Sequence, residues 1–384
     1  MKVLVRGGGA QGSAAAFDLV QRAQVERVVV ADRDLGHPAP FLAPHMGARL
    51  EFRALDARDP AQVREAMQDA DAVLCALPYT FNLQMAALAV EAGAHYCDLG
   101  GNTEIVERQR GLDARAVGAG VSVIPDCGVA PGMVNILAQG GIDALDRVDS
   151  VRMFVGGLPQ KPKPPLNYQI VYSMQGVLDY YTTPSVVLEN GEIANREALS
   201  EVEELLFPEP VGKLEAFHTA GGASTMPYRY RGRIPRLEYK TLRYPGHAHI
   251  MRTIRELGLL TQEKIRVDDC EVSPRDLFIE VVSPKLRGDH SPDLVVLRVE
   301  VSGEKGGARK TIRYELLDRN DEEHGITAMM RTTGYSLAVT TLMQADGRVR
   351  EKGVRTPDEV IPAAAYIAEL ATRGVVVSRS ELNP

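Results

Sequence analysis

Cysteine is scarce in this sequence, and the histidines form no metal-binding motif. Only four of the 384 residues are cysteines, Cys75, Cys97, Cys127 and Cys270, and none belongs to a CxxC pair. Structural zinc sites and disulfide frameworks depend on closely patterned cysteines. The eight histidines include no HExxH pattern. We therefore expect neither a disulfide framework nor a metal site.

The sequence also lacks an excess of positive charge and a long apolar segment. Its 51 acidic and 44 basic residues give a formal net charge of −7, so no basic surplus is available to neutralise nucleic-acid phosphates. No apolar run reaches the roughly 18 residues that a membrane-spanning helix needs. Met1 leads directly into an apolar, strand-like segment and not into a signal peptide. These absences predict a cytoplasmic protein with a small-molecule partner, engaging neither nucleic acid nor membrane.

The first third of the chain contains a regular alternation of short apolar runs and helix-like stretches. Strands are expected at residues 2–5, 27–31, 50–55, 72–77, 95–99 and 121–124, with helices at 11–22, 60–69, 81–92 and 104–118. Strands that alternate with helices of this length form parallel sheets covered on both faces. The pattern therefore predicts an α/β fold with a doubly wound Rossmann-type parallel sheet.

A glycine motif follows the first expected strand and opens the first expected helix. The segment reads Gly7-Gly8-Gly9-Ala10-Gln11-Gly12, a GxGxxG pattern in the context that dinucleotide-binding sites require. Gly7 permits the tight turn, Gly9 lets the backbone approach a pyrophosphate, and Gly12 lets the helix pack closely on the strand. The diphosphate then lies at the positive helix N-terminus. We expect this segment, including Ala10 and Gln11, to bind the cofactor.

Asp32 ends the second expected strand, 20 residues after Gly12, where the ribose-binding acid of a Rossmann domain belongs. A carboxylate about 4 Å from the 2′-phosphate of NADP costs a few kcal/mol at an effective dielectric constant near 20. Arg33 follows directly and softens that repulsion. The sequence therefore predicts NAD, with NADP less favoured.

Other strand ends are expected at the same edge of the sheet, because ligands of open α/β sheets bind beyond the carboxyl ends of the strands. The cofactor candidates there are Asp56 and Ala57 near the adenine, Leu77, Pro78 and Tyr79 along the cofactor, and Leu99, Gly100 and Gly128 near the nicotinamide. Asp98 and Asp126 end neighbouring strands and are also expected near the nicotinamide.

The strict alternation stops after a helix expected at residues 131–144. Strands are then expected at 150–155, 276–282, 294–301 and 310–316 without intervening helices, and helical periodicity returns at 327–343 and 357–371. We expect residues 1–130 and 325–384 to form the dinucleotide-binding domain. Residues 131–324 are expected to form an inserted α+β domain for catalysis, substrate binding and oligomerisation. The apolar C-terminal helices are expected to pack on the nucleotide domain or on a partner subunit, which favours a homo-oligomer.

Three polar clusters in the middle of the chain are candidates for substrate binding. They supply Tyr168, Gly222, Thr225, Arg243 and His247. Arg243 is the candidate clamp for a substrate carboxylate, because a guanidinium group offers a planar bidentate fork. Each of these residues, taken alone, also fits a structural role.

Several long segments carry a family resemblance. They are residues 98–101, 125–135, 155–159, 164–168, 214–219, 221–225 and 237–244. In these segments the sequence resembles the saccharopine dehydrogenase-like oxidoreductases, and within them the lysine 6-dehydrogenase group most closely. The resemblance implies a nucleotide-binding domain completed by the end of the chain and an enzyme of amino-acid metabolism. It further implies NAD-dependent oxidation of the lysine side-chain amine, and it places Arg243 where relatives hold a substrate carboxylate.

The implied chemistry requires a base, because a lysine ammonium with a pKa near 10.4 cannot release hydride while protonated. Asp98 and Asp126 are the expected candidates, with His95 and His218 in reserve. Two other functions fit the same sequence. One is a saccharopine-type or carboxynorspermidine-type reductive coupling of an aldehyde with an amine, dependent on NAD or NADP. The other is a non-catalytic protein that senses NAD(H).

Overall fold

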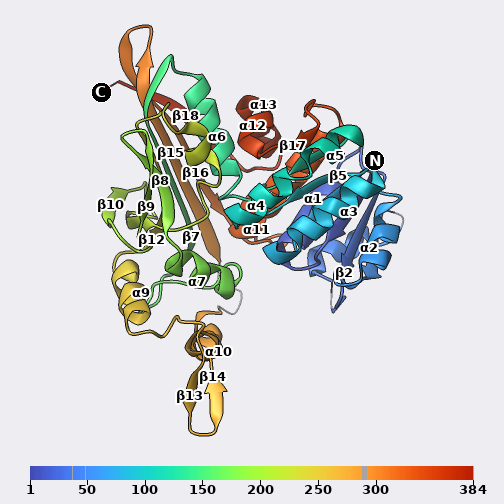
Figure 1. The fold of residues 1–384 in the computed structure, drawn as a ribbon, viewed down its shortest axis with the longest axis horizontal. Helices are drawn as coiled ribbons and strands as arrows, with labels where there is room; N and C mark the ends of the chain where they lie inside the picture. Colours follow the sequence, from blue (N-terminus) through green and yellow to red (C-terminus); the bar gives the residue numbers. More distant parts are fainter. Residues whose placement is uncertain (37, 48, 288–291, 384) are drawn as a thin grey trace. The chain divides into compact units, whose positions relative to one another are not determined.

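A computed structural model of the chain describes residues 1–36, 38–47, 49–287 and 292–383 (Figure 1). The chain divides into two compact units. The first unit comprises Met1–Ala144 and Asn320–Ser378, and the second comprises Leu145–Arg319 and Arg379–Pro384. Most of the second unit therefore lies between the two segments of the first, and the chain returns to the second unit after Ser378, which differs from the expected assignment of residues 325–384 to the nucleotide-binding domain.

The first unit contains a seven-stranded parallel sheet. Its strands are β1 (Lys2–Arg6), β2 (Arg27–Asp32), β3 (Leu50–Ala54), β4 (Ala72–Cys75), β5 (His95–Asp98), β6 (Ser122–Ile124) and β17 (Gly353–Val354). They lie in the order β17-β6-β5-β4-β1-β2-β3. The order reverses between β1 and β4, the position at which doubly wound sheets bind their ligands. The predicted fold class is confirmed.

Helices connect these strands, and their starts follow local sequence signals. They are α1 (Ala10–Val20), α2 (Pro60–Met67), α3 (Asn82–Ala92), α4 (Thr103–Arg110), α5 (Asp113–Gly118) and α6 (Met133–Asp143), with 3₁₀ turns η1 (Pro40–His45) and η2 (Tyr79–Phe81). The Asp59 carboxylate accepts hydrogen bonds from the Ala61 and Gln62 amides, both at 3.1 Å, and Pro60 occupies the first helical position. This arrangement satisfies amides that the helix itself leaves free.

A late segment of the chain, Asn320–Ser378, completes the first unit. Helix α11 (Ala328–Ala345) packs against α1, β4 and β5, and it is buried along almost its whole length. The side chain of Gln344 donates hydrogen bonds to the carbonyl oxygens of Tyr96 and Ser122 at 3.0 and 3.1 Å. Helices α12 (Pro357–Val360) and α13 (Ala363–Ala371) pack on α6. The apolar content of the tail is thus explained by packing within the first unit.

The second unit is built on a nine-stranded mixed sheet. Its strands are β7 (Arg147–Pro159), β8 (Ser185–Glu189), β9 (Glu192–Arg196), β10 (Glu203–Leu206), β11 (Lys213–His218), β12 (Arg236–Arg243), β15 (Asp293–Lys305), β16 (Ala308–Arg319) and β18 (Val377–Leu382). The helices are α7 (Met174–Thr182), α8 (Met226–Tyr230), α9 (His247–Glu256) and α10 (Pro274–Leu286), and β13 (Ile265–Val267) pairs with β14 (Cys270–Val272) in a separate hairpin. Helices α7, α9 and α10 contribute apolar side chains to one core cluster.

Two expectations about the middle of the chain are wrong. Residues 276–282 were expected to form a strand but lie in α10. Ser273 caps this helix by accepting a hydrogen bond from the Asp276 amide, Pro274 occupies its first turn, and Phe278 and Ile279 pack on the same core cluster as Leu286. These are helix-start signals. Helix α6, expected in the inserted domain, packs in the first unit instead.

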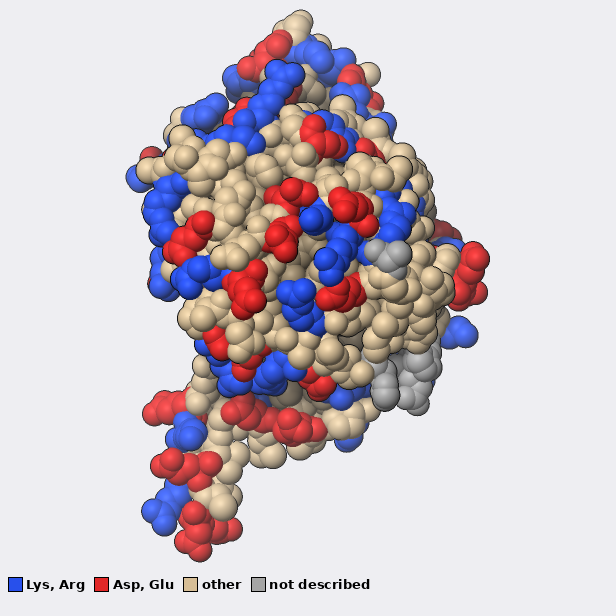
Figure 2. All heavy atoms as spheres, turned by 90° about the vertical axis from the view of Figure 1, so that its right-hand side faces the viewer, with Lys and Arg blue, Asp and Glu red and all other residues tan. Residues whose placement is uncertain are grey.

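Charged side chains of both signs are mixed on the surface. On the face shown in Figure 2, lysine and arginine side chains are interspersed with aspartate and glutamate. In the part of the chain that the structure describes, no helix is long and apolar enough to cross a membrane.

Candidate functional site

The glycine turn after β1 has the geometry that a dinucleotide phosphate requires. Gly7 has a φ of 98°, and a Cβ there would lie 2.9 Å from the backbone of Ala76. A Cβ on Gly12 would lie 1.9 Å from the Gly7 carbonyl oxygen, whereas a Cβ on Gly9 would meet nothing within 4 Å. The first and last glycines therefore permit close packing, and Gly9 faces open space in front of α1. The turn fits a pyrophosphate at the helix N-terminus, beside Ala10 and Gln11.

Asp32 lies beside this turn at the end of β2. Its Oδ2 accepts a hydrogen bond of 2.7 Å from the Gly8 amide, and the following Arg33 is exposed. Arg6, which the sequence analysis missed, is fully buried and donates hydrogen bonds to the carbonyl oxygens of Ala31 and Leu55 at 3.1 and 3.4 Å. This arginine ties the ends of three neighbouring strands together, and so it supports the edge on which Asp32 lies.

The remaining cofactor candidates are distributed along the same edge. Leu77, Pro78 and Tyr79 follow β4, which pairs directly with β1. The carboxylate of Asp56 is engaged by Arg58 at 2.6 Å, and hydrogen bonds from Arg58 lower the pKa of Asp56 to about 2. Ala57 is buried. Asp56 therefore already has a cationic partner, and its contact with an adenine stays a prediction.

Asp98 is enclosed at the end of β5. It is completely buried, and its carboxylate accepts hydrogen bonds from the Gly100 amide and the Gln109 side chain, both at 2.7 Å, and from the Asp126 amide at 3.4 Å. Burial raises the pKa of Asp98 to about 6, although these hydrogen bonds oppose the rise. The contacts fix the turn of Leu99 and Gly100 to the neighbouring strand end, which is a structural use of this carboxylate.

Asp126 lies next to Asp98 in a strained backbone conformation. Its φ is 63°, and its Oδ1 accepts a hydrogen bond of 3.3 Å from the Gly101 amide. A Cβ on Gly100 would lie 1.6 Å from the same oxygen, so only glycine fits there. The carbonyl oxygen of Gly128 accepts a 3.0 Å hydrogen bond from Ser336 of α11. The structure thus brings Asp98, Leu99, Gly100, Asp126 and Gly128 together.

The expectation for His95 is wrong, because it lies at the opposite edge of the sheet. It begins β5, three residues before Asp98, which places it about 10 Å from the carboxyl edge at 3.3 Å per residue. Its Nδ1 accepts a hydrogen bond of 3.0 Å from the Ser122 amide, and burial lowers its pKa to about 4. A hollow of about 630 Å³ adjoins it at this amino edge. His95 does not share a site with the glycine turn.

In the second unit, Arg243 forms the centre of an aromatic cluster. It ends β12, is 3% exposed, and lies over the ring of Tyr168 at 4.9 Å from the ring centroid. One terminal nitrogen donates to the carbonyl oxygen of Leu242, whereas among the described residues no hydrogen-bond partner meets the distance and angle limits for its Nε or for the Tyr168 hydroxyl, which faces the guanidinium. Tyr172 and Tyr181 face the same guanidinium, and its charge lowers their pKa against the larger effect of burial, which raises it.

His247 joins this cluster from the first turn of α9. Its ring lies 5.3 Å from that of Tyr168, centroid to centroid, and stacks at 6.3 Å on Phe217. Its Nδ1 lies 3.0 Å from the carbonyl oxygen of Leu166, and its Nε2 lies 3.0 Å from the Tyr181 hydroxyl. Tyr168, Arg243 and His247, which lie far apart in the sequence, therefore meet in one buried cluster.

His218, a reserve candidate for the base, does not lie with Arg243, the expected clamp for the substrate carboxylate. In the antiparallel register Glu215 pairs with Arg243 and His218 pairs with Lys240. Because successive side chains of a strand alternate between faces, His218 lies on the face opposite Arg243. There its Nε2 lies 3.2 Å from a carboxylate oxygen of Glu201. His218 belongs to a network of charged residues on that other face.

Gly222 lies close to the Arg243 face of the sheet, since a Cβ on it would lie 2.4 Å from the ring of Tyr239. Tyr239 is four residues before Arg243 on β12, and so it points to the same face. Thr225 is buried at the start of α8. Substrate contacts of Gly222 and Thr225 stay predictions.

Two family models cover nearly the whole chain. Residues 3–124 match the saccharopine dehydrogenase NADP binding domain, and residues 128–375 match the saccharopine dehydrogenase C-terminal domain. The chain belongs to the saccharopine dehydrogenase family. It is accordingly an NAD(P)-dependent oxidoreductase of the amine and amino-acid dehydrogenase class.

Individual family members are distant in sequence. The Schizosaccharomyces pombe saccharopine dehydrogenase [NADP(+), L-glutamate-forming] is 24% identical over 94% of each chain. The Saccharomyces cerevisiae enzyme of the same name is 22% identical over 86% of this chain and 88% of its own. The solved apo structure of the Saccharomyces cerevisiae L-Glu-forming enzyme covers 99% of both chains with a TM-score of 0.80 at 19% identity. At this identity the structural likeness establishes the fold.

The family could be recognised from the sequence, but several residues that line the two clusters could not be predicted from it. Arg6, Gln109, Tyr172, Tyr181 and Tyr239 carry no motif that distinguishes them from core residues. Their roles depend on contacts between segments that lie far apart in the chain, such as Gln109 with Asp98 or Tyr181 with His247. A tyrosine-rich stretch beside the expected Tyr168 was the one available signal for part of this set.

Proposed function

We propose that this saccharopine dehydrogenase family member oxidises the side-chain amine of lysine with NAD as the hydride acceptor. The carbon that bears the amine loses hydride and the nitrogen loses a proton, which gives an imine. Water adds to the imine, ammonia leaves, and the 6-semialdehyde cyclises. The observation that carries the proposal is the buried Arg243 guanidinium, which has no acidic partner among the described residues.

An unpaired charge inside a protein is costly. Removing a cation from water without an anionic partner costs several kcal/mol in real proteins. A substrate carboxylate supplies that partner and accepts from a planar, bidentate donor. Among the residues that the structure describes, the Nε of Arg243 and the Tyr168 hydroxyl lack an acceptor, so they are two further donors for such a carboxylate. The cluster therefore supports a substrate that carries a carboxylate, as an amino acid does and a simple diamine does not.

The number of cations in the cluster favours lysine over saccharopine. Saccharopine carries three carboxylates, whereas free lysine carries one. Within the described cluster of Tyr168, Tyr172, Tyr181, Arg243 and His247, Arg243 is the one cation, because burial and the Arg243 charge lower the pKa of His247 to about 3. One buried cation balances one carboxylate. The resemblance to the lysine 6-dehydrogenase group supports the same substrate.

The cofactor preference rests on Asp32. When bound, the dinucleotide accepts the hydride, and the glycine turn and the N-terminus of α1 hold its diphosphate. The Asp32 carboxylate, oriented by the Gly8 amide, fits the ribose hydroxyls of NAD and repels a 2′-phosphate. We propose a preference for NAD, although the matched family model and the yeast relatives carry NADP in their names.

Asp126 is the proposed base for the substrate amine. Of the four candidates, His95 lies at the wrong edge and His218 on the wrong face, and the Asp98 carboxylate is occupied by three donors. Asp126 has a strained, left-handed φ of 63° at the end of β6. Strain of this kind concentrates at functional positions.

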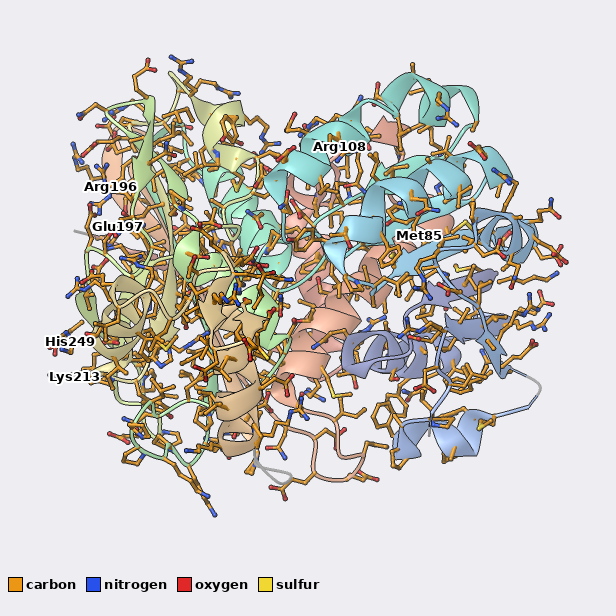
Figure 3. The ribbon with its side chains drawn as sticks, turned by 60° about the horizontal axis from the view of Figure 1, so that its bottom comes forward. Met85, Arg108, Arg196, Glu197, Lys213 and His249 are labelled. Carbon is orange, nitrogen blue, oxygen red and sulfur yellow. The ribbon has the colours of Figure 1, made fainter. Side chains whose placement is uncertain are left out.

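The proposed function is tested by following NAD reduction at about 340 nm, the band of reduced nicotinamide, with lysine, saccharopine and 1,5-diaminopentane as separate substrates. We expect turnover with lysine and none with saccharopine. Arg243→Met should raise the KM for lysine by about 100-fold, the effect of losing a charge-assisted pair, and leave the diamine unaffected. Lys213→Met is the matched control, because Lys213 lies exposed at the outer edge of the second unit (Figure 3).

A change of cofactor preference tests Asp32 separately. We expect Asp32→Ala to raise the kcat/KM ratio of NADP to NAD by about 100-fold, which corresponds to the loss of a few kcal/mol of charge repulsion. Asp34→Ala, which removes the exposed acid two residues further on, should leave the ratio unchanged. A wild-type enzyme that already uses NADP as well as NAD would contradict the preference.

The yeast relatives, which are named as NADP(+)-dependent, L-glutamate-forming saccharopine dehydrogenases, favour a second candidate, a saccharopine-type reaction, whose reverse is the reductive coupling of an aldehyde with an amine. Turnover with saccharopine and none with lysine would establish that reaction. Binding of NAD(H) without any absorbance change for every amine would instead leave the non-catalytic sensor.

A further inference from the structure

The Tyr181 hydroxyl and the His247 ring form a hydrogen-bonded pair beside Arg243. Tyr181 comes from α7 and is 1% exposed, and His247 comes from the first turn of α9 and is 2% exposed. The Tyr181 oxygen lies 3.0 Å from His247 Nε2. The same hydroxyl also interacts with the Arg243 guanidinium, which lowers the pKa of Tyr181 against the larger effect of burial. The pair therefore links a helix N-terminus to the cation that the proposed substrate meets.

The partners of His247 determine where its proton lies. A carbonyl oxygen only accepts, so the 3.0 Å contact with Leu166 requires a hydrogen on Nδ1. Burial, with the nearby Arg243 charge, lowers the pKa of His247 to about 3, and so the ring is neutral near pH 7. Nε2 then carries no hydrogen and accepts from the Tyr181 hydroxyl. The Tyr181 oxygen keeps its lone pairs for the guanidinium.

Glu215 holds the backbone on either side of His247. Its two carboxylate oxygens accept hydrogen bonds from the Gly246 amide at 2.9 Å and from the Ala248 amide at 2.6 Å. Amides at a helix N-terminus favour such a negative partner. Glu215 also pairs in register with Arg243 on the neighbouring strand. Because both carboxylate oxygens of Glu215 accept hydrogen bonds from the start of α9, Glu215 does not form an ion pair with Arg243.

We propose that His247 is a positioning residue for carboxylate recognition: it orients the Tyr181 hydroxyl so that Tyr181 holds the Arg243 guanidinium ready for the carboxylate of the substrate. This inference rests on the proposed function and deepens it. It replaces the expectation that His247 itself contacts the substrate, because both ring nitrogens already have partners within the protein. The substrate class it selects is an amine with a carboxylate at its other end.

The test compares binding of lysine with binding of 1,5-diaminopentane, which lacks the carboxylate, by calorimetry on the full-length protein. We expect Tyr181→Phe and His247→Leu each to weaken lysine binding about tenfold, the effect of one lost hydrogen bond, and to leave diamine binding unchanged. The double variant should be no weaker than either single variant, because both changes remove one shared interaction. His247→Gln, whose amide oxygen can still accept from Tyr181, should recover part of the loss.

Matched controls separate positioning from general damage to the fold. His249→Gln changes an exposed histidine on the same helix, at the outer edge of the second unit (Figure 3). Tyr314→Phe removes the hydroxyl of a buried tyrosine from β16 of the same sheet. Neither control should change the ratio of lysine to diamine affinity. A ratio unchanged in Tyr181→Phe, or additive losses in the double variant, would overturn the inference.

A second measurement reads the proton on His247 directly and does not depend on turnover. With ¹⁵N-labelled histidine, we expect His247 to remain a neutral Nδ1–H tautomer from pH 8 down to about pH 4, more than two units below the ordinary histidine pKa. An Nε2–H tautomer, or a charged ring at about pH 6, close to that ordinary value, overturns the inference. Lysine binding without NAD reduction would instead overturn the proposed function and leave the positioning result standing.

Discussion

At the scale of single residues, Asp98 and Asp126 show how two neighbouring carboxylates acquire different roles. Asp98 ends β5 and Asp126 lies two residues after β6, and the sequence offers both as candidate bases. The structure distinguishes them, because Asp98 accepts three hydrogen bonds from the protein while Asp126 adopts a left-handed backbone conformation. Asparagine is nearly isosteric with aspartate and tolerates left-handed φ. The two Asp→Asn variants therefore form a matched pair.

For Asp98→Asn we expect turnover within about threefold of the wild type and a changed pH dependence of stability. Folding raises the pKa of Asp98 from an ordinary value near 3.8 to about 6, so its stabilising contribution is complete below pH 3.8 and is lost as pH rises through 6. A difference of this size between the pKa values of the folded and unfolded states corresponds to about 3 kcal/mol of unfolding free energy. The variant lacks this titration, so the difference in unfolding free energy between variant and wild type should shift by about 3 kcal/mol in favour of the variant from roughly pH 4 to pH 7. Thermal unfolding at a series of pH values measures this difference.

The side-chain amide that Asp98→Asn introduces has a partner available, since the side-chain oxygen of Gln109 is buried without one and a flip of that amide presents it. A large loss of turnover, together with a pH dependence of stability that matches the wild type, would indicate that Asp98 is the base.

For Asp126→Asn we expect turnover to fall by at least about 100-fold, the lower end of what general-base catalysis contributes. The amide keeps an oxygen for the Gly101 amide but cannot accept a proton from the amine. The KM for NAD should change little. The measurement is NAD reduction with saturating lysine from about pH 6 to about pH 10, which brackets the titration of the substrate amine. Equal rates for the variant and the wild type would exclude Asp126 as the general base.

At the scale of secondary structure, the contact between α1 and α11 couples the end of the chain to the cofactor site. A Cβ on Gly334 would lie 2.8 Å from the Ala14 Cβ and 2.8 Å from the Gln11 carbonyl oxygen, so the two helices touch at this glycine. Helix α1 presents its N-terminus to the expected diphosphate. A displacement of α1 by α11 therefore reaches the cofactor directly.

We expect Gly334→Ala to destabilise the protein by about 1–2 kcal/mol, since overpacking costs more than the gain in helix propensity returns. It should also raise the KM for the dinucleotide. Gly118→Ala in α5 is the control, because a Cβ there meets nothing within 4 Å. Calorimetric unfolding with and without NAD measures both effects. An unchanged melting temperature in Gly334→Ala would show that the helices separate without cost.

Secondary structure was predictable where the local pattern was strong. The alternation in the first third indicated all six strands of that region, because buried parallel strands are short, continuous apolar runs. The strands from β8 to β12 escaped prediction, although β8 and β9 form a hairpin around Asn190-Gly191, which is a turn signal in the sequence. In contrast, β12 pairs with β7, which lies far away along the chain. Residues 276–282 were misread because a run of apolar and β-branched residues outweighed the Ser273-Pro274 helix start.

At the scale of the whole molecule, a buried ion pair joins the beginning and the end of the chain. Arg373 follows α13 and its Nε lies 2.9 Å from the Asp18 carboxylate in α1, with both side chains 1% exposed. Arg373 also bonds Glu369 at 2.7 Å. A buried pair of this kind specifies one arrangement of the C-terminal segment.

We expect Arg373→Leu to destabilise the protein by about 3 kcal/mol, because it leaves the Asp18 charge buried without this partner. The double variant Asp18→Leu/Arg373→Leu should recover part of that loss, since it removes the buried carboxylate as well; Arg22, the other partner of Asp18, is partly exposed and can be solvated. Melting temperatures from calorimetry provide the comparison. A double variant less stable than Arg373→Leu alone would show that the pair itself stabilises the fold.

The predicted homo-oligomer stays a prediction, and the structure removes its original reason. That expectation rested on the apolar content of the C-terminal helices. Helix α11 buries its apolar residues against α1 and the parallel sheet, and α12 and α13 cover α6. Light scattering of the purified protein measures its oligomeric state.

The sequence by itself determined the properties that are encoded over short distances. A dinucleotide-binding fold is specified within one contiguous segment by the glycine turn, by Asp32 and by the alternation of strands and helices. Each of these features depends on the backbone geometry of a few adjacent residues. The long matching segments determined the family. The tertiary structure alone decided which of several equivalent polar residues share a site. Within the first unit it placed His95 three residues from Asp98 at the other edge of the sheet, and within the second it placed His218 on the face opposite Arg243 and brought Tyr181 and His247 together. Strand ends, sheet faces and helix packing are properties of the assembled chain.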